Sequence, residues 1–217
     1  LALKIGDGRL DAAETGTGLV RALIACKAAG ADLINLSFGE PSWQPDSGRT
    51  AQTFTDAVRK WGMSVFTSAG NDGPALSTLG SPGDLTAPIV VGAFISPSMM
   101  IDQYSMLEPS PSAGDEPSGE VAIDPTSYSF SSRGPTPDGW LPTLCAPGGA
   151  IAPVPRHTLQ GKAQYHGTSM SSPNACGVAA CVISALRQRG VNVGPMELRR
   201  ALENSATPVA QYDPFAP

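Results

Sequence analysis

A serine at the start of an apolar segment is the first candidate for chemistry in this sequence. Ser169 lies within residues 165–173 (YHGTSMSSP), and the small, apolar residues that follow predict a buried helix. Ser169 is therefore expected in or near the first turn, where backbone N–H groups are free and the helix dipole is positive. A hydroxyl beside such a donor suits nucleophilic acyl transfer. The plainer interpretation is that Thr168 or Ser169 only caps the helix.

Pro173 should affect the same turn. It has no N–H to donate to the carbonyl four residues earlier, which belongs to Ser169. The sequence therefore predicts a first turn that is loose around the serine.

Asn71 is the second candidate, because an amide can stabilise a negative charge while remaining neutral. It follows a predicted strand (63–69) and has Gly70 and Gly73 close by, which allow another group to approach the backbone. Such a donor suits an oxyanion that exists only in the transition state. The segment by itself is also a common turn sequence. Together with Ser169 at a helix start, it predicts an oxyanion hole.

Alternating strands and helices must position these two side chains. The predicted strands are 1–5, 32–38, 63–69 and 88–95, with shorter extended segments at 127–131, 141–146 and 150–154, and the predicted helices are 19–29, 50–61, the segment after Ser169 and 195–205. This order predicts an α/β fold with a mostly parallel sheet and helices on both faces. Ligands of such sheets bind at the carboxyl ends of the strands, where residues 37–40 and 69–71 are expected.

Composition narrows the classes of function. The chain has 217 residues, a net charge of −5 and no basic cluster, which argues against nucleic acid as a partner. No apolar run is long enough to suggest a membrane span. The four cysteines do not have metal-ligand spacing with either histidine, so we expect structural thiols in a reducing compartment, no metal and no cofactor.

Several segments together resemble the subtilisin-like serine peptidases, or subtilases. They are 35–39 (NLSFG), 68–74 (SAGNDGP), 130–135 (FSSRGP), 146–149 (APGG) and 167–170 (GTSM). The resemblance covers about residues 1–206 and implies a partial subtilisin-like three-layer domain. Four further segments look like the tripeptidyl-peptidase II branch of that family: 14–18 (ETGTG), 37–40 (SFGE), 97–100 (PSMM) and 171–177 (SSPNACG).

The resemblance implies roles for the candidate residues. Ser169 would be the nucleophile, and its own N–H together with the Asn71 side chain would form the oxyanion hole. Glu14 and Glu40 would bind the free N-terminus of a peptide substrate, since two carboxylates attract an ammonium group. The simpler alternative is that Glu14 caps the helix near residue 17 and that Glu40 is a loop charge.

The segment after the second predicted strand would form one wall of the substrate pocket. The wall would consist of Leu36, Ser37, Phe38 and Gly39, with either Phe38 filling volume or Gly39 offering backbone hydrogen bonds. The implied activity is release of tripeptides from free N-termini through an acyl-enzyme. The implied setting is a cytoplasmic homo-oligomer.

Two segments of the family pattern are absent. The family's Asp-Ser/Thr-Gly and His-Gly-Thr-His motifs do not occur, and the histidines present are His157 and His166. His166 is three residues before Ser169, but the intervening Gly-Thr turn should aim its ring away from the hydroxyl. We therefore expect residues 1–206 to be the C-terminal part of a catalytic domain. Its upstream half would supply Asp and His, and this chain alone should be inactive.

Residues 106–125 are predicted to be a mobile insert because Pro, Ser, Gly and acidic residues dominate there. Residues 207–217 are predicted to be a tail or the start of a following region. Two other functions stay open. One is a non-catalytic subtilase-like module for assembly or peptide binding. The other is a subtilisin-type endopeptidase, against which the Glu14 and Glu40 pair argues.

Overall fold

Parallel strands form the centre of the computed structural model, which describes residues 1–7, 13–42, 44–104, 125–153 and 161–208. These strands are β3 (Leu33–Leu36), β4 (Ser64–Ser68), β5 (Ile89–Ile95) and β7 (Leu144–Pro147). β4 pairs with β3 and with β5, and β5 also pairs with β7, always in parallel. A parallel sheet must be covered on both faces, and every residue of β4 is buried.

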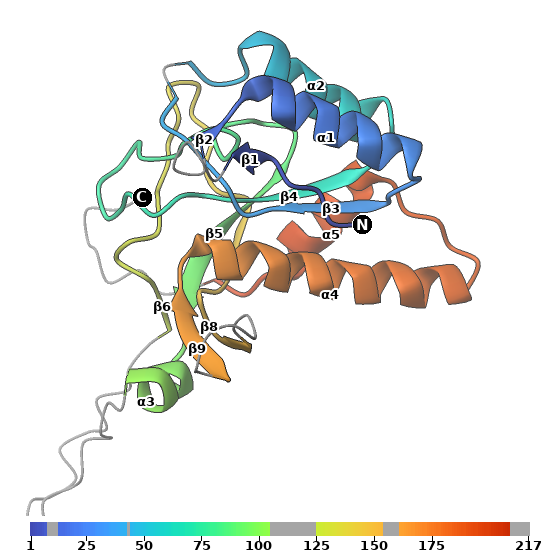
Figure 1. Cartoon of the computed structure of the whole chain (residues 1–217). Helices are drawn as coiled ribbons and strands as arrows, with labels where there is room; N and C mark the ends of the chain where they lie inside the picture. Colours follow the sequence, from blue (N-terminus) through green and yellow to red (C-terminus); the bar gives the residue numbers. More distant parts are fainter. Residues whose placement is uncertain (8–12, 43, 105–124, 154–160, 209–217) are drawn as a thin grey trace, which may run out of the picture.

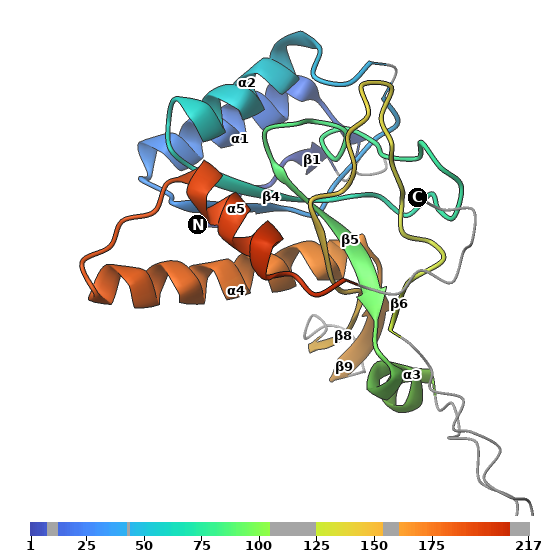
Figure 2. The same ribbon diagram turned by 180° about the vertical axis from the view of Figure 1, so that it is seen from behind.

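Helices cover the two faces of this sheet. The helices α1 (Gly16–Ala28) and α2 (Gly48–Arg59) lie on one face, and α4 (Thr168–Gln188) and α5 (Pro195–Ser205) lie on the other (Figures 1 and 2). Successive side chains of a strand point to opposite faces. Accordingly, Val65 packs in the core under α1 and α2, while its neighbour Phe66 packs against α4 and α5. This is the predicted α/β architecture.

Smaller elements surround the central sheet. They are the antiparallel pair β1 (Gly6–Asp7) and β2 (Ala13–Glu14), the helix α3 (Pro97–Tyr104), the strand β6 (Thr126–Ser127), and the hairpin of β8 (Gly149–Pro153) and β9 (Lys162–His166). β6 pairs antiparallel with β5. The sequence did not predict α3 or β9. β9 is short and polar, with no apolar alternation, and its pairing with β8 defines it as a strand.

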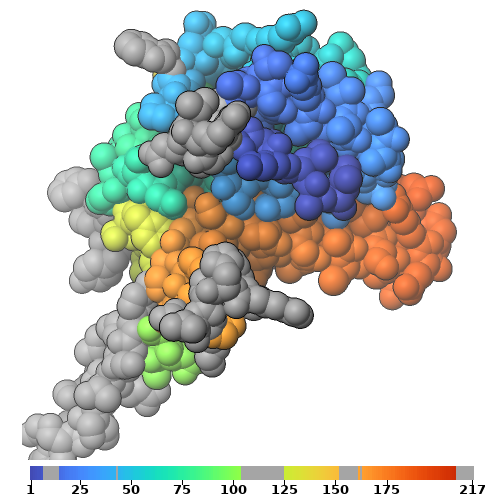
Figure 3. Space-filling view, in the orientation of Figure 1, coloured from blue at the N-terminus to red at the C-terminus, as the bar shows by residue number. Residues whose placement is uncertain are grey.

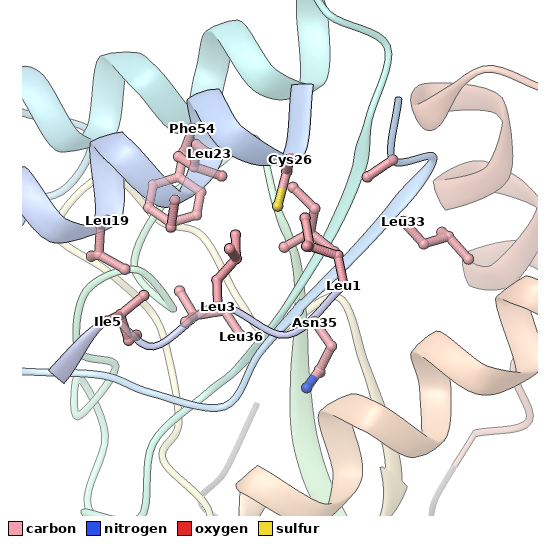
Figure 4. Close-up of a pocket in the computed structure, with 13 residues that line it drawn as sticks. Leu1, Leu3, Ile5, Leu19, Leu23, Cys26, Leu33, Asn35, Leu36 and Phe54 are labelled. Carbon is pink, nitrogen blue, oxygen red and sulfur yellow. The ribbon is translucent and has the colours of Figure 1, made fainter. Parts of the chain in front are cut away.

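The prediction of a strand at 1–5 is wrong. In the structure, residues 1–5 belong to no strand, and the first strand of the chain, β1, begins at Gly6. The apolar side chains before β1 line a pocket of about 210 Å³ between α1 and β3 (Figure 4). Leu1, Leu3 and Ile5 face this pocket together with Leu23 and Cys26 of α1. Leu1 and Leu3 nevertheless stay 84% and 38% exposed, and only Ile5 of this segment packs against the core under α1 and α2.

Two predicted boundaries lie outside the described residues. The insert at 106–125 is not described apart from residue 125, and of the tail only residues 207 and 208 are described. Both stay predictions. The last predicted helix, at 195–205, is confirmed as α5 with the same bounds, and Pro195 is its first residue.

The helix α4 is long and apolar enough to cross a membrane by length and composition alone. Core helices of globular proteins meet the same criteria. Its inner face packs against β3, β4, β5 and β7 and buries Ala175, Ala179 and Ile183. Its outer face, which includes the half-exposed Val178, lies along the molecular surface (Figure 3). The packing on the sheet identifies α4 as a core helix.

The cysteines of this chain are free thiols. Cys26, Cys145, Cys176 and Cys181 form no disulfide. Partial burial raises the pKa of the Cys26 and Cys176 thiols, which favours their protonated form.

Candidate active site

The start of α4 carries the candidate nucleophile. The helix begins at Thr168 and its N-cap is Gly167, so Ser169 is the second helical residue. The predicted placement in the first turn is confirmed. The interpretation of Thr168 or Ser169 as a simple cap is wrong, because the N-cap is a glycine and both hydroxyls bind elsewhere.

The hydroxyl and the backbone of Thr168 orient the Asn71 amide. The Asn71 Oδ1 atom accepts hydrogen bonds from the Thr168 N–H at 2.9 Å and from the Thr168 hydroxyl at 3.0 Å. Only an oxygen can accept both bonds, so the amide orientation is fixed and Nδ2 is the end left to donate. Thr168 itself is fully buried. The sequence did not predict this role, although the residue adjoins Ser169.

Gly167 lies where the two candidate oxyanion donors converge. A Cβ atom at this position would be 3.4 Å from Asn71 Nδ2 and 3.7 Å from the Ser169 backbone nitrogen. Both nitrogens are therefore near one point in space, as donors to a single oxygen must be. The backbone of Gly167, with φ of 157°, is also one that side chains rarely tolerate. The predicted pairing of Asn71 with Ser169 is thus present in the geometry.

The loop that carries Asn71 is held by Ser132. The Ser132 hydroxyl accepts from the Asp72 N–H at 3.0 Å, and the Ser132 N–H donates to the Gly70 carbonyl at 2.9 Å. A side chain at Gly70 would clash with the same hydroxyl at 2.7 Å. The sequence motif 130–135 therefore contributes through loop support, a role that its composition alone did not indicate.

Ser37 contacts the candidate nucleophile directly. Its hydroxyl donates to the Ser169 carbonyl at 2.9 Å, and the Ser169 hydroxyl donates to the Ser37 carbonyl at 3.4 Å. The Ser169 carbonyl is the group that Pro173 leaves without a helical donor. The predicted looseness of this turn is therefore wrong, because Ser37 replaces the missing bond.

A groove of about 440 Å³ has Phe38, the residue after Ser37, in its lining. Phe38 and Glu40 line it from the segment after β3, and Gly16 and Leu19 line it from α1. Glu40 is exposed, and its backbone exchanges two hydrogen bonds with Ser81, at 2.9 and 2.7 Å. These bonds fix the wall of the groove. Of the predicted wall, Phe38 lines this groove, as does Glu40, the predicted contact for the substrate N-terminus; both roles stay predictions.

Glu14 lies at the end of β2, two residues before Gly16 of the groove. It does not cap α1, because the N-cap is Thr15, whose hydroxyl accepts from the Gly18 N–H at 3.2 Å. The capping alternative for Glu14 is therefore wrong. The Glu14 side chain lies outside what the structure describes, so its pairing with Glu40 stays a prediction.

The structure describes one of the two histidines, His166. His166 ends β9 and is exposed, with its ring centroid 6.2 Å from that of Tyr128. The hydroxyl of Ser169 points to the Ser37 carbonyl. His157 lies outside the described residues. Within the described part of the chain, no group of three or more His, Cys, Asp or Glu side chains could hold a metal ion.

Asp84 is a buried carboxyl group close to the groove. Ser42 lines the groove and also a smaller pocket of about 120 Å³ that Asp84 lines. Asp84 is 3% exposed, and among the described residues neither carboxylate oxygen accepts a hydrogen bond of normal geometry. Burial raises the pKa of Asp84 by more than the nearby hydroxyls of Ser42 and Ser81 lower it. A charged Asp84 therefore destabilises the fold.

Asp84→Asn is expected to stabilise the full-length protein at pH 7, by about 1 kcal/mol, because a buried charge without a full set of partners is removed. The folded state binds the Asp84 proton more tightly than the unfolded state does. Wild-type stability should therefore fall as the pH rises from the ordinary pKa of 3.8 through the raised folded value. Denaturant midpoints at pH 4 and pH 7 measure this, with the exposed Asp138→Asn as control. A smaller advantage at pH 7 than at pH 4 would contradict the assignment.

Comparison with known proteins agrees with this geometry. The model of the Subtilase family (Peptidase_S8) matches residues 1–215. The chain is 50% identical to Tripeptidyl-peptidase 2 of Arabidopsis thaliana over 96% of its length and 14% of that protein, and 45% identical to Tripeptidyl-peptidase 2 of Oryza sativa over 97% and 15%. It is 31% identical to Pyrolysin of Pyrococcus furiosus over 82% and 13%.

The solved structures give the same result. The crystal structure of Tripeptidyl Peptidase 2 (TPP II) superposes with a TM-score of 0.72 at 35% identity, over 99% of this chain and 15% of that one. The chain thus spans about one seventh of the length of these relatives. The match of the family model over nearly all residues, with a serine at a helix start beside an oriented asparagine, shows that the chain belongs to the subtilase family of serine peptidases.

Proposed function

We propose that the protein containing this chain is a tripeptidyl aminopeptidase, which releases tripeptides from free peptide N-termini. The observation that carries the proposal is the groove that contains Glu40. It is lined by Glu40, by the start of α1 and by Phe38, which follows Ser37, the residue that contacts Ser169. Relatives named Tripeptidyl-peptidase 2 support the same activity.

The chemistry follows from the groups at the start of α4. The Ser169 oxygen attacks the carbonyl carbon of the third substrate residue and gives its proton to a base. The negative charge that forms on the carbonyl oxygen is stabilised by the Ser169 N–H and the Asn71 Nδ2. The C–N bond then breaks as the proton passes to the leaving amine. Water hydrolyses the resulting ester, which frees the tripeptide and restores the serine.

Glu40, together with Glu14, would set the length of the product. A carboxylate at the end of the groove attracts the substrate ammonium group. Three extended residues span about 10 Å. A substrate held by its N-terminus then places its third carbonyl at Ser169, and a fourth residue before the cut would push the ammonium group past the carboxylates.

We propose that the base and its aspartate partner come from the upstream half of the same catalytic domain. The chain lacks both sequence motifs that carry these groups in the family, and it spans a small part of its relatives. On this proposal the chain by itself does not hydrolyse peptides. Adding the upstream half should restore hydrolysis.

The cellular setting proposed is a cytoplasmic homo-oligomer. Four free cysteines fit a reducing compartment. Light scattering of the full-length protein would give its oligomeric state, and a monomer would contradict this part of the proposal.

The test of the activity compares two hexapeptides that differ only in N-terminal acetylation. The full-length protein should release the N-terminal tripeptide from the free peptide and leave the acetylated one intact. Equal cleavage of both would indicate a subtilisin-type endopeptidase. Binding without cleavage, and without labelling by a fluorophosphonate, would indicate a non-catalytic peptide-binding module.

Glu40→Gln is expected to lower kcat/KM for the free peptide by about 10- to 100-fold, because a charge-assisted hydrogen bond to the ammonium group is lost. The effect should appear mainly in KM, since the ammonium group is bound in the ground state and the transition state alike. Initial rates with free and acetylated peptides measure it. Asp138→Asn, an exposed charge change outside the groove, is the control. Unchanged selectivity in Glu40→Gln would exclude Glu40 from N-terminus binding.

A further inference from the structure

Pro173 leaves the backbone carbonyl of Ser169 without its usual helical hydrogen bond. In the interior of α4, residue 173 would normally donate its N–H to the carbonyl of residue 169, but proline has no N–H. The Ser169 carbonyl instead accepts a hydrogen bond of 2.9 Å from the Ser37 hydroxyl, which comes from a segment 132 residues earlier. The geometry of the nucleophile turn thus depends on a side chain outside its own helix.

The Ser37 hydroxyl is itself held by two further residues. Asn35 of β3 donates its Nδ2–H to the Ser37 oxygen at 3.2 Å. The buried Ser172 of α4 donates its hydroxyl proton to Asn35 Oδ1 at 2.7 Å. Figure 4 shows the Asn35 side chain pointing away from the apolar pocket, towards α4. This series of hydrogen bonds therefore runs from Ser172 of α4 to Asn35 of β3, then to Ser37, and ends at the Ser169 carbonyl in α4.

One arrangement of protons satisfies this whole connection. Ser37 has a single hydroxyl proton, and the Ser169 carbonyl requires it because a carbonyl only accepts. The Ser37 oxygen must then accept from Asn35, which requires the amide nitrogen on that side. The amide oxygen consequently faces Ser172 and accepts its proton. Each bond fixes the direction of the next, and aligned bonds of this kind strengthen one another.

We propose that Ser37 is a positioning residue for the nucleophile, and that its hydroxyl, held by Asn35 and Ser172, replaces the helical hydrogen bond that Pro173 removes. The proposal rests on Ser169 as the nucleophile of the proposed function. By anchoring the Ser169 carbonyl, Ser37 fixes the backbone that carries both the attacking oxygen and the N–H donor of the oxyanion hole. It acts through Ser169 and not on the substrate.

Ser37→Ala in the full-length protein should lower kcat by about 10-fold, because a misplaced nucleophile loses the benefit of its orientation. KM should stay within about 2-fold, since the groove residues Phe38 and Glu40 are unchanged. The rate of fluorophosphonate labelling should fall by the same factor as kcat. Ser37→Thr keeps the hydroxyl and should restore most of the rate. A fall in melting temperature with normal kcat would overturn the proposal.

The decisive experiment repeats the substitution in a Pro173→Ala background. Pro173 is exposed, so alanine leaves no buried cavity there, and it supplies the N–H that can donate to the Ser169 carbonyl. The effect of Ser37→Ala on kcat should then shrink from about 10-fold to about 2-fold. An undiminished effect would show that Ser37 does not act through this carbonyl.

Ser171→Ala is the matched control. Ser171 is also a fully buried serine in the first turns of α4, but among the described residues its hydroxyl has no hydrogen-bond partner. Its loss should leave kcat and the labelling rate unchanged, and a loss equal to that of Ser37→Ala would overturn the proposal. Labelling does not require a tripeptide product, so a failed Ser37 prediction and a failed substrate assignment can be told apart. Retention of labelling in Ser169→Ala would reject the nucleophile itself.

Discussion

Replacing Ser169 by alanine is expected to lower the kcat of the full-length protein by about 10⁶-fold, a magnitude taken from subtilisin, which belongs to the same family. The reason is the loss of the oxygen that forms the acyl-enzyme. KM should change little, because the groove wall at Phe38 and Glu40 is untouched. Hydrolysis of a free hexapeptide and labelling by a fluorophosphonate measure the two consequences.

Ser169→Ala should remove the hydroxyl with little effect on the stability of the protein. The Ser169 hydroxyl has a long hydrogen bond of 3.4 Å to the Ser37 carbonyl, so little stability depends on it. The melting temperature should therefore stay close to that of the wild type. The Ser171→Ala control shares the helix and the chemical change. Substantial peptidase activity in Ser169→Ala would remove the catalytic role from this helix start.

Asn71→Asp should lower kcat by at least about 10²–10³-fold, the cost of removing one oxyanion donor from subtilisin. Aspartate keeps an oxygen for the Thr168 N–H and hydroxyl, so the contacts at 2.9 and 3.0 Å can persist. It loses the Nδ2 donor and places a negative charge near the oxyanion. KM should hold, because the donor acts only in the transition state.

Asn71→Ala separates the two roles of the residue. It removes the same donor but also leaves the N–H of the buried Thr168 without its acceptor, which should cost about 1–3 kcal/mol of stability; the Thr168 hydroxyl can still donate to the Gly70 carbonyl. Both variants should therefore lose activity, while only the alanine variant loses stability. A normal kcat in Asn71→Asp would show that the amide nitrogen does not bind the oxyanion.

Several helices and strands of the chain could be predicted from the sequence. Apolar spacing and a proline at the first position define α5, and continuous β-branched and apolar runs define β4 and β5. Small residues after Ser169 place it in the first turn of α4. These features depend on neighbours within a few residues, which is why pattern and propensity suffice. Segment 1–5 shows the limit, because a short apolar run has the same form whether it pairs as a strand or, as here, does not pair and leaves Leu1 and Leu3 exposed.

Tertiary structure alone decided how the site is assembled. Thr168 orients Asn71 across 97 residues, Ser37 holds Ser169 across 132, and Ser81 fixes the backbone of Glu40. Serine, threonine and asparagine can donate or accept in many settings, so their partners are set by which strand ends and helix starts the fold brings together. The sequence by itself determined that a serine stands at a helix start without a helical partner for its carbonyl. Only the folded sheet determined that Ser37 supplies the missing bond, because that contact joins residues far apart in the chain.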